Sequence, residues 1–310
     1  DITVEHIELG SFQLRTRNRM LTGSMVAMVT PMNGDGSIDW AGLERLVEHH
    51  VAQGTDAIVS VGTTGESATL DHGEHAEVIE RTVKAVAGRI PVIGGTGSNS
   101  TEETIVMTRS AQEAGVSACL LVVPYYNKPP QEGLYQHFRS IAEAVAVPQI
   151  LYNVPGRTGV DMDNDTTLRL SEIDNIVGIK DATNDLDRGA DLIKRTADNF
   201  AVYSGEDGTA CGLMLAGGQG TISVTANAAP RLMHEMCTAA VMGDKETALQ
   251  VDGQLRDLHT AMFVQSNPIP AKWAVSQQGL IGAGIRLPLI ELDSSYHDTV
   301  KAAMTIAGVL

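Results

Sequence analysis

Residues 91–123 read PVIGGTGSNSTEETIVMTRSAQEAGVSACLLVV and contain two apolar runs separated by one amphipathic segment. The runs, Pro91–Gly94 and Ala118–Val123, are almost continuously apolar, as is typical of parallel strands that are buried on both faces. The intervening segment, Thr101–Ala114, follows Ser100 and carries Glu103, a spacing that predicts a capping box at the start of a helix. This stretch therefore predicts a strand, a helix and a second strand parallel to the first.

The same alternation continues along most of the chain. Apolar runs recur about every 20 to 35 residues, which is the size of one strand-helix unit. A helix is predicted between the first two runs over Ala41–Gln53, with Gly54 as its stop. Eight such units favour an α/β fold of the (β/α)8 TIM-barrel type over an open sheet. The eight runs are Met25–Val29, Ala57–Val61, Pro91–Gly94, Ala118–Val123, Gln149–Asn153, Ile176–Lys180, Ala201–Ser204 and Gly220–Val224.

The two ends of the chain differ from this pattern. Residues 1–19 have neither the apolar core of a secretory signal nor the acid-poor composition of a transit peptide, so we expect a non-native or disordered leader before Met20. Residues 20–244 form the predicted barrel. Residues 245–310 have a helical pattern broken at Asn267-Pro268-Ile269-Pro270, which predicts a C-terminal helical extension.

Charge and cysteine content exclude several classes of partner. The chain has 38 acidic and 22 basic residues, a net charge of −16, whereas nucleic acids and anionic membranes attract basic patches. No apolar run approaches the roughly 18 residues that span a bilayer. The three cysteines, Cys119, Cys211 and Cys237, lack metal or redox spacing and are expected to be buried free thiols in a reducing cytoplasm.

A lysine closes the otherwise apolar run Ile176–Lys180. Barrels of this type place their active sites at the carboxyl ends of the strands, so Lys180 is expected in the site. A buried amine can lose its proton and attack a carbonyl to form a Schiff base, and Tyr152 at the end of the neighbouring run is placed to transfer protons. The alternative is a lysine whose stem lies along the barrel while its ammonium reaches water.

Three other strand ends carry polar or aromatic residues. Gly62-Thr63-Thr64-Gly65-Glu66 can aim amides and hydroxyls at a carboxylate, although it also suits an ordinary tight turn. Arg157 follows a Pro-Gly pair and suits a carboxylate, or a surface acid. Tyr125-Tyr126 suits a site, core packing or an interface equally well.

Neither a cofactor nor a metal is predicted. The glycine-rich stretches at 94–97 and 217–220 match no nucleotide-binding fingerprint. His72 and His75 share a helix face behind an Asp71-x-x-Glu74 cap, but their spacing matches no zinc protease pattern and no second carboxylate ligand is evident.

Taken together, the strand ends resemble the dihydrodipicolinate synthase family, a group of pyruvate-dependent lyases built on (β/α)8 barrels. The resemblance runs from Met20 to Leu310 and includes five motifs in order. They are Gly62-Thr63-Thr64-Gly65-Glu66, Pro124-Tyr125-Tyr126-Asn127, Tyr152-Asn153-Val154-Pro155-Gly156-Arg157-Thr158, Gly178-Ile179-Lys180 and Ile222-Ser223-Val224-Thr225-Ala226-Asn227.

The resemblance implies condensation of pyruvate with aspartate semialdehyde on Lys180, in lysine and diaminopimelate biosynthesis. It implies that Thr63 and Thr64 hold the pyruvate carboxylate and that Arg157 holds the semialdehyde carboxylate. Thr63 would also link Tyr152 to Tyr126 of a neighbouring subunit in a proton relay. Gly205 and Ile222 would line the pyruvate pocket through their backbones.

The resemblance also implies a cytoplasmic homotetramer built from tight dimers, with feedback inhibition by lysine at the dimer interface. The implied lysine-binding positions are Ser67, Ala68, His72, His75, Asn99, Glu103 and Tyr125. Two positions depart from close relatives: Gly156 stands where serine is more frequent, and Asp181 follows Lys180 where glutamate is more usual.

Two rival functions remain open on the sequence. One is another pyruvate aldolase, such as a sialic acid or keto-deoxy-sugar lyase, against which Arg157 argues. The other is a catalytically inactive barrel that binds a ligand, against which the complete set of catalytic positions argues.

Overall fold

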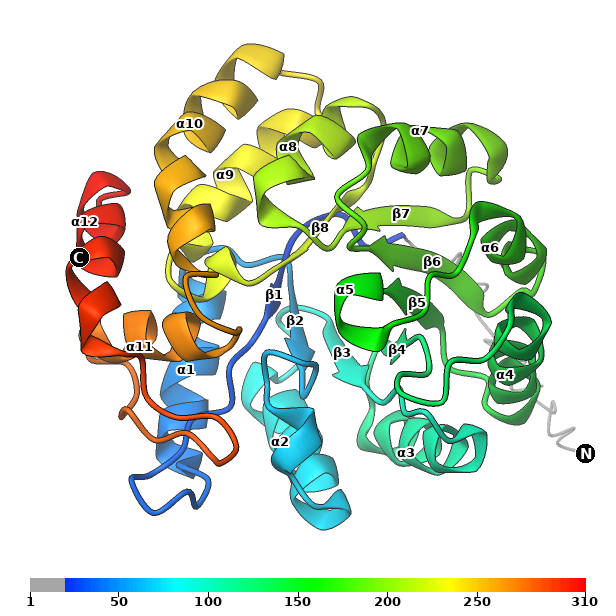
Figure 1. Ribbon diagram of the computed structural model, residues 1–310, viewed down its shortest axis with the longest axis horizontal. Coiled ribbons are helices and arrows are strands. Elements are labelled where there is room, and N and C mark those ends of the chain that lie inside the picture. Colours follow the sequence, from blue (N-terminus) through cyan, green and yellow to red (C-terminus); the bar gives the residue numbers. More distant parts are fainter. Residues whose placement is uncertain (1–19) are drawn as a thin grey trace, which may run out of the picture.

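The computed structural model describes residues 20–310, and the predicted leader over residues 1–19 lies outside them. Eight parallel strands close into a barrel in chain order, with β8 paired to β1, as the sequence predicts. In Figure 1 the strands lie at the centre and the helices surround them. The strands are β1 (Gly23–Ala27), β2 (Ala57–Ser60), β3 (Val92–Gly95), β4 (Ala118–Val122), β5 (Gln149–Asn153), β6 (Ile176–Asp181), β7 (Ala201–Ser204) and β8 (Gly220–Ser223).

Helices follow the strands and cover the outside of the barrel. The longer ones, α1 to α4 and α6 to α9, bury one face against the strands, and α1 to α4, α6 and α7 leave the other face in solvent. Their bounds, with the short α5, are α1 (Trp40–Ala52), α2 (His72–Val86), α3 (Thr101–Ala114), α4 (Gln131–Ala144), α5 (Pro155–Thr158), α6 (Asn164–Ser171), α7 (Leu186–Arg195), α8 (Asp207–Leu215) and α9 (Pro230–Val241). Short 3-10 turns lie at η1 (Ser67–Thr69), η2 (Thr225–Asn227) and η3 (Ser294–Tyr296).

The C-terminal extension consists of α10 (Lys245–Ala261), α11 (Ile269–Gln277) and α12 (His297–Ile306). α10 packs against α8 and α9, and α12 packs against α10. The prediction of helix on both sides of the Asn267–Pro270 break was too simple, because residues 278–293 form no helix. Polar side chains and backbone contacts hold that stretch in place: Arg286, for example, binds the carbonyls of Gly36 and Thr69.

Two hydrophobic clusters stabilise this arrangement. One lies between the strands and the helices, and the other fills the barrel interior with side chains such as Met25, Ile93 and Tyr203. Cys119, Cys211 and Cys237 are buried free thiols, as expected. Within residues 20–310, no helix combines the length and the hydropathy needed to cross a membrane.

The start of α3 corrects one detail of the sequence analysis. Ser100 does accept a hydrogen bond from the Glu103 amide, but the Glu103 carboxylate does not return to the Ser100 amide. That amide binds the Ser98 hydroxyl, and the Glu103 carboxylate binds Ser98 and His72. The predicted capping box is therefore only half present at α3, whereas the Asp71–Glu74 box at α2 is complete.

Candidate active site

Lys180 lies inside the barrel near the carboxyl end of β6. It stands opposite Tyr152 on β5 and Tyr203 on β7, and only 5% of its surface is exposed. Its Nζ lies 4.1 Å from the centre of the Tyr152 ring. The structure thus brings together the amine and the phenol that the sequence placed on adjacent strands.

Gly205, directly after β7, lies beside Lys180, and Ile222 lies on β8. A Cβ at Gly205 would lie 2.7 Å from the Cβ of Ala182 and 3.0 Å from the Cε of Lys180, so only glycine leaves room beside the lysine. Ile222 is buried in the cluster that fills the barrel interior. Gly205 therefore shapes the wall beside Lys180, and Ile222 forms part of the barrel interior.

The turn after β2 holds Thr63 and Thr64 at the barrel mouth. A Cβ at Gly65 would lie 2.9 Å from the Cα of Val61 and 3.2 Å from the carbonyl oxygen of Met28, so the turn can be this tight only with glycine there. The Gly65 carbonyl accepts a hydrogen bond of 2.7 Å from Thr30, and the Glu66 amide donates to the Thr63 carbonyl over 3.1 Å. These contacts fix the positions of both threonines.

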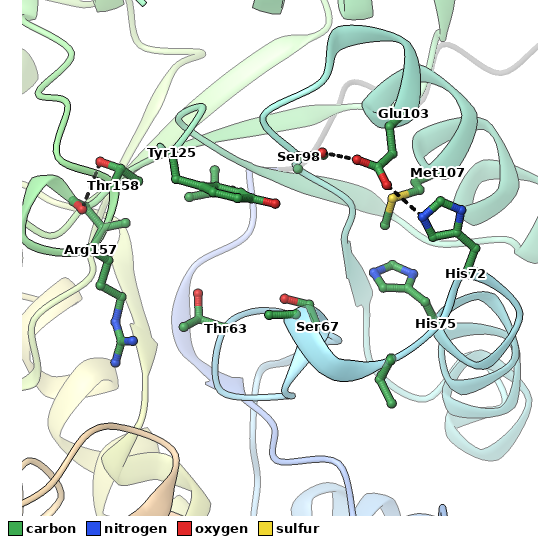
Figure 2. Close-up of a pocket in the computed structure, with 15 residues that line it drawn as sticks. Thr63, Ser67, His72, His75, Ser98, Glu103, Met107, Tyr125, Arg157 and Thr158 are labelled. Carbon is green, nitrogen blue, oxygen red and sulfur yellow. Dashed lines mark hydrogen bonds and ion pairs between the residues drawn. The ribbon is translucent and has the colours of Figure 1, made fainter. Parts of the chain in front are cut away.

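Arg157 lies on α5, the short helix that follows β5. Its NH2 group donates to the carbonyl of Asn267 over 3.2 Å. Within the described residues no carboxylate lies within ion-pair distance of its guanidinium, so the charge is available to an anion at the barrel mouth. Arg157 forms one end of a cavity of about 420 Å³, and Thr63 lies between that end and the other (Figure 2).

The far end of the cavity is built from α2 and α3. The Nε2 of His72 lies 2.7 Å from a carboxylate oxygen of Glu103, whose other oxygen accepts from Ser98 (Figure 2). The Ser98 hydroxyl, and then His72, lower the pKa of the Glu103 carboxyl. Burial lowers the pKa of His75 to about 4, although its hydrogen bond to the Gly95 backbone opposes that shift. Near neutral pH this end therefore presents a carboxylate and a neutral imidazole.

The structure brings most of the implied lysine-binding residues into this one cavity. Asn99 does not line the cavity itself, but its side-chain amide donates to the Tyr125 carbonyl over 3.2 Å. The residues among the seven that line the cavity are Ser67, Ala68, His72, His75, Glu103 and Tyr125.

Tyr126 is set apart from the other candidate catalytic residues. Its surface is 89% exposed, and its backbone has a left-handed φ of 73°. Within its own chain, Tyr126 therefore lies away from the barrel interior that holds Lys180 and Tyr152.

Three charged or polar residues near the site were not predicted from the sequence: Asn267, Lys272 and Glu206. Asn267 touches both Thr64 and Arg157, and Lys272 forms an ion pair with Glu66. Glu206 lies near Lys180 and Arg157; burial raises the pKa of its carboxyl, and those two cations oppose the rise. In the sequence, Asn267 is visible only as part of a helix break, and Glu66 only as the end of a turn motif.

Comparison with known proteins gives one consistent family. Residues 20–307 match the model of the dihydrodipicolinate synthetase family. The chain is 60% identical to a 4-hydroxy-tetrahydrodipicolinate synthase of Ectopseudomonas mendocina over 291 residues, which cover 94% of this chain and 100% of the relative.

Two solved structures are similar throughout. The Acinetobacter baumannii dihydrodipicolinate synthase, described as chloride inhibited and complexed with pyruvate, is 54% identical with a TM-score of 0.93, covering 94% of this chain and 100% of the other. The Cyanidioschyzon merolae enzyme with lysine bound is 41% identical with a TM-score of 0.91, covering 94% and 99%.

Proposed function

The chain belongs to the dihydrodipicolinate synthetase family, and we propose that Lys180 is the residue through which it condenses pyruvate with aspartate 4-semialdehyde. The reaction is that of the 4-hydroxy-tetrahydrodipicolinate synthases, lyases of lysine and diaminopimelate biosynthesis. One observation carries the role of Lys180: it is a buried amine at the carboxyl end of a barrel strand, with a phenol ring 4.1 Å away.

The chemistry begins at the Lys180 Nζ. The neutral amine adds to the keto carbon of pyruvate, and loss of water gives an imine. A methyl proton then leaves, forming an enamine whose carbon attacks the aldehyde of the second substrate. The amino group of that substrate next displaces the Lys180 Nζ from the imine carbon, which closes the ring and frees the enzyme.

The neighbouring residues supply binding and proton transfer. Tyr152 is the group placed to move protons to and from the reacting atoms, because its phenol ring lies beside the Lys180 Nζ. Thr63 and Thr64 hold the pyruvate carboxylate at the turn after β2. Arg157, which has no acidic partner within residues 20–310, holds the carboxylate of the semialdehyde. Gly205 and Ile222 bound the pyruvate pocket.

A substrate comparison tests this function against that of a sugar lyase. The purified protein is assayed with pyruvate and either aspartate semialdehyde or a sugar aldehyde, with a Lys180→Gln variant as the blank. Turnover of the semialdehyde alone is expected, since the Arg157 guanidinium can bind the carboxylate of this short substrate. Turnover of the sugar aldehyde alone would assign the chain to the rival group of aldolases.

We also propose that lysine inhibits the enzyme from the far end of the cavity. The support is the Glu103 carboxylate, which can bind an ammonium group, together with a lysine-bound relative of 41% identity. Millimolar lysine is expected to inhibit the parent enzyme, and Glu103→Gln is expected to weaken inhibition at least tenfold, since a charge-assisted contact is worth about 1.5–3 kcal/mol. Glu102→Gln, on the same helix but outside the cavity, is the matched control. Unchanged activity at millimolar lysine would overturn the proposal.

We propose that the protein is a tetramer built from tight dimers. In each dimer, Tyr126 of one subunit would complete the proton relay of Thr63 and Tyr152 in the other. The 89% exposure of Tyr126 in the single chain supports this role, because its side chain is free to enter the site of a neighbouring subunit. Co-expression of Lys180→Gln and Tyr126→Phe subunits tests it. If Tyr126 acts across the interface, each mixed dimer has one intact site, and about a quarter of the parent activity returns. No recovery would show that Tyr126 serves its own chain, and about half of the parent activity would show that it serves no site.

A further inference from the structure

One residue of the C-terminal extension contacts two residues of the proposed substrate site. Asn267 lies in the segment between α10 and α11, which reaches inward toward the strands (orange in Figure 1). Its side-chain Nδ2 lies 2.9 Å from the Thr64 Oγ1, and its carbonyl oxygen accepts from Arg157 over 3.2 Å. Asn267 is 5% exposed and its bond to Thr64 is buried, so water does not compete for that bond.

The chemistry of the first bond sets the direction of the Thr64 hydroxyl. A carboxamide nitrogen can only donate, so the Thr64 oxygen accepts from Asn267 and keeps its own hydrogen free. A substrate carboxylate can only accept. A hydroxyl whose lone pair is already engaged by Asn267 is therefore prepared to donate to such a group.

We propose that Asn267 is a positioning residue that orients the Thr64 hydroxyl toward the pyruvate carboxylate. The inference rests on the role proposed above for Thr64. The backbone carbonyl of Asn267 also accepts a hydrogen bond from Arg157, so Thr64 and Arg157 both contact one residue outside the barrel.

A buried ion pair holds Asn267 against the turn after β2. Lys272, on the first turns of α11, contacts the Glu66 carboxylate at 2.5 Å, and their side chains are 2% and 0% exposed. Glu66 follows Thr64 by two residues, and its left-handed φ of 59° turns the chain toward the extension. The Arg286 amide donates to the second Glu66 oxygen over 3.3 Å. The C-terminal extension therefore contacts the turn after β2 at two residues, Thr64 and Glu66.

A double-mutant cycle on Thr64→Val and Asn267→Ala tests the proposal. Asn267→Ala is expected to raise the KM for pyruvate roughly tenfold, because it weakens the charge-assisted hydrogen bond from the Thr64 hydroxyl to the pyruvate carboxylate. The KM for the semialdehyde should rise less, because alanine retains the carbonyl that Arg157 uses. In a Thr64→Val background, Asn267→Ala should change the KM for pyruvate less than about twofold, since the hydroxyl it orients is gone.

The matched control is Asn175→Ala. The Asn175 side chain donates to the carbonyls of Ala142 and Val145 at the opposite end of the barrel, so its loss is expected to lower Tm without changing the KM for pyruvate. Full additivity of the Thr64 and Asn267 substitutions, or an unchanged KM in Asn267→Ala, would overturn the proposal.

Borohydride trapping of pyruvate separates this outcome from failure of the proposed function. If the parent protein and Asn267→Ala both trap pyruvate on Lys180, the Lys180 assignment stands and the KM values test only the positioning role of Asn267. If the parent protein traps none, the Lys180 assignment is wrong and the role of Asn267 is overturned with it.

Discussion

At the scale of single residues, Lys180 and Tyr152 divide the work of the proposed site between an amine and a phenol. Both are buried, and cross-strand pairing of β5 with β6 places them directly opposite each other. Their proximity is therefore a consequence of barrel register and requires no loop movement. This places the proposed proton-transfer group beside the amine proposed to form the imine.

Tyr152→Phe separates these two roles. The variant retains the ring that contacts Lys180 but has no hydroxyl, so kcat should fall by roughly 10²–10⁴-fold while pyruvate is still trapped on Lys180. Tyr203→Phe is the control, because the Tyr203 hydroxyl binds the Leu21 carbonyl just before β1, at the amino end of the barrel. A Tyr152→Phe variant with the kcat of the parent protein would remove Tyr152 from the mechanism.

Arg157→Ala should affect the two substrates unequally. The net charge of the chain is −16, yet each substrate carries a carboxylate, so local cations have to make the barrel mouth attractive to those groups. Removal of the guanidinium should raise the KM for the semialdehyde by on the order of 10–100-fold, because a charge-assisted bidentate contact is lost. The KM for pyruvate should rise far less. Equal increases in both values would contradict the assignment of Arg157 to the second substrate.

At the scale of secondary-structure elements, local sequence predicts the barrel but not the way the extension completes the site. Burial on both faces makes each strand nearly all apolar, so all eight strands were predicted within about two residues of their ends, and α3 was predicted over its observed range. Positions such as Lys180 and Arg157 could be predicted because one lies near the carboxyl end of β6 and the other in the short segment after β5. Asn267 could not, because its partner Thr64 lies 203 residues away and no local pattern records that contact.

Lys272→Met tests how strongly α11 holds the turn after β2. The substitution leaves the Glu66 carboxylate buried without its cation, which should lower the free energy of unfolding by about 3–5 kcal/mol. Glu66→Gln combined with Lys272→Met removes both charges and should recover most of that loss. Urea unfolding of the three proteins provides the measurement. A double variant less stable than Lys272→Met would show that the ion pair does not act as a unit.

At the scale of the whole molecule, buried histidines make stability depend on pH. Burial lowers the pKa of His50 to about 3 and the pKa values of His75 and His137 to about 4. In the unfolded chain a histidine titrates near 6.5, so between about pH 6.5 and pH 4 the unfolded state binds more protons. The free energy of unfolding should therefore fall as the pH falls through that window.

Thermal unfolding between pH 7 and pH 5 measures this dependence. Three histidines that stay neutral in the folded state give a slope of at most about 4 kcal/mol per pH unit. His137→Gln should make the slope shallower, because only two of the three groups then contribute. A Tm that does not change between pH 7 and pH 5 would show that these histidines are protonated in the folded protein.

Reduction of the protein with borohydride in the presence of pyruvate, followed by mass mapping of its peptides, tests the role of Lys180 most directly. A reduced pyruvate adduct is expected on the peptide that contains Lys180, and none when pyruvate is omitted. An unmodified Lys180, or an adduct on a different lysine, would contradict that role.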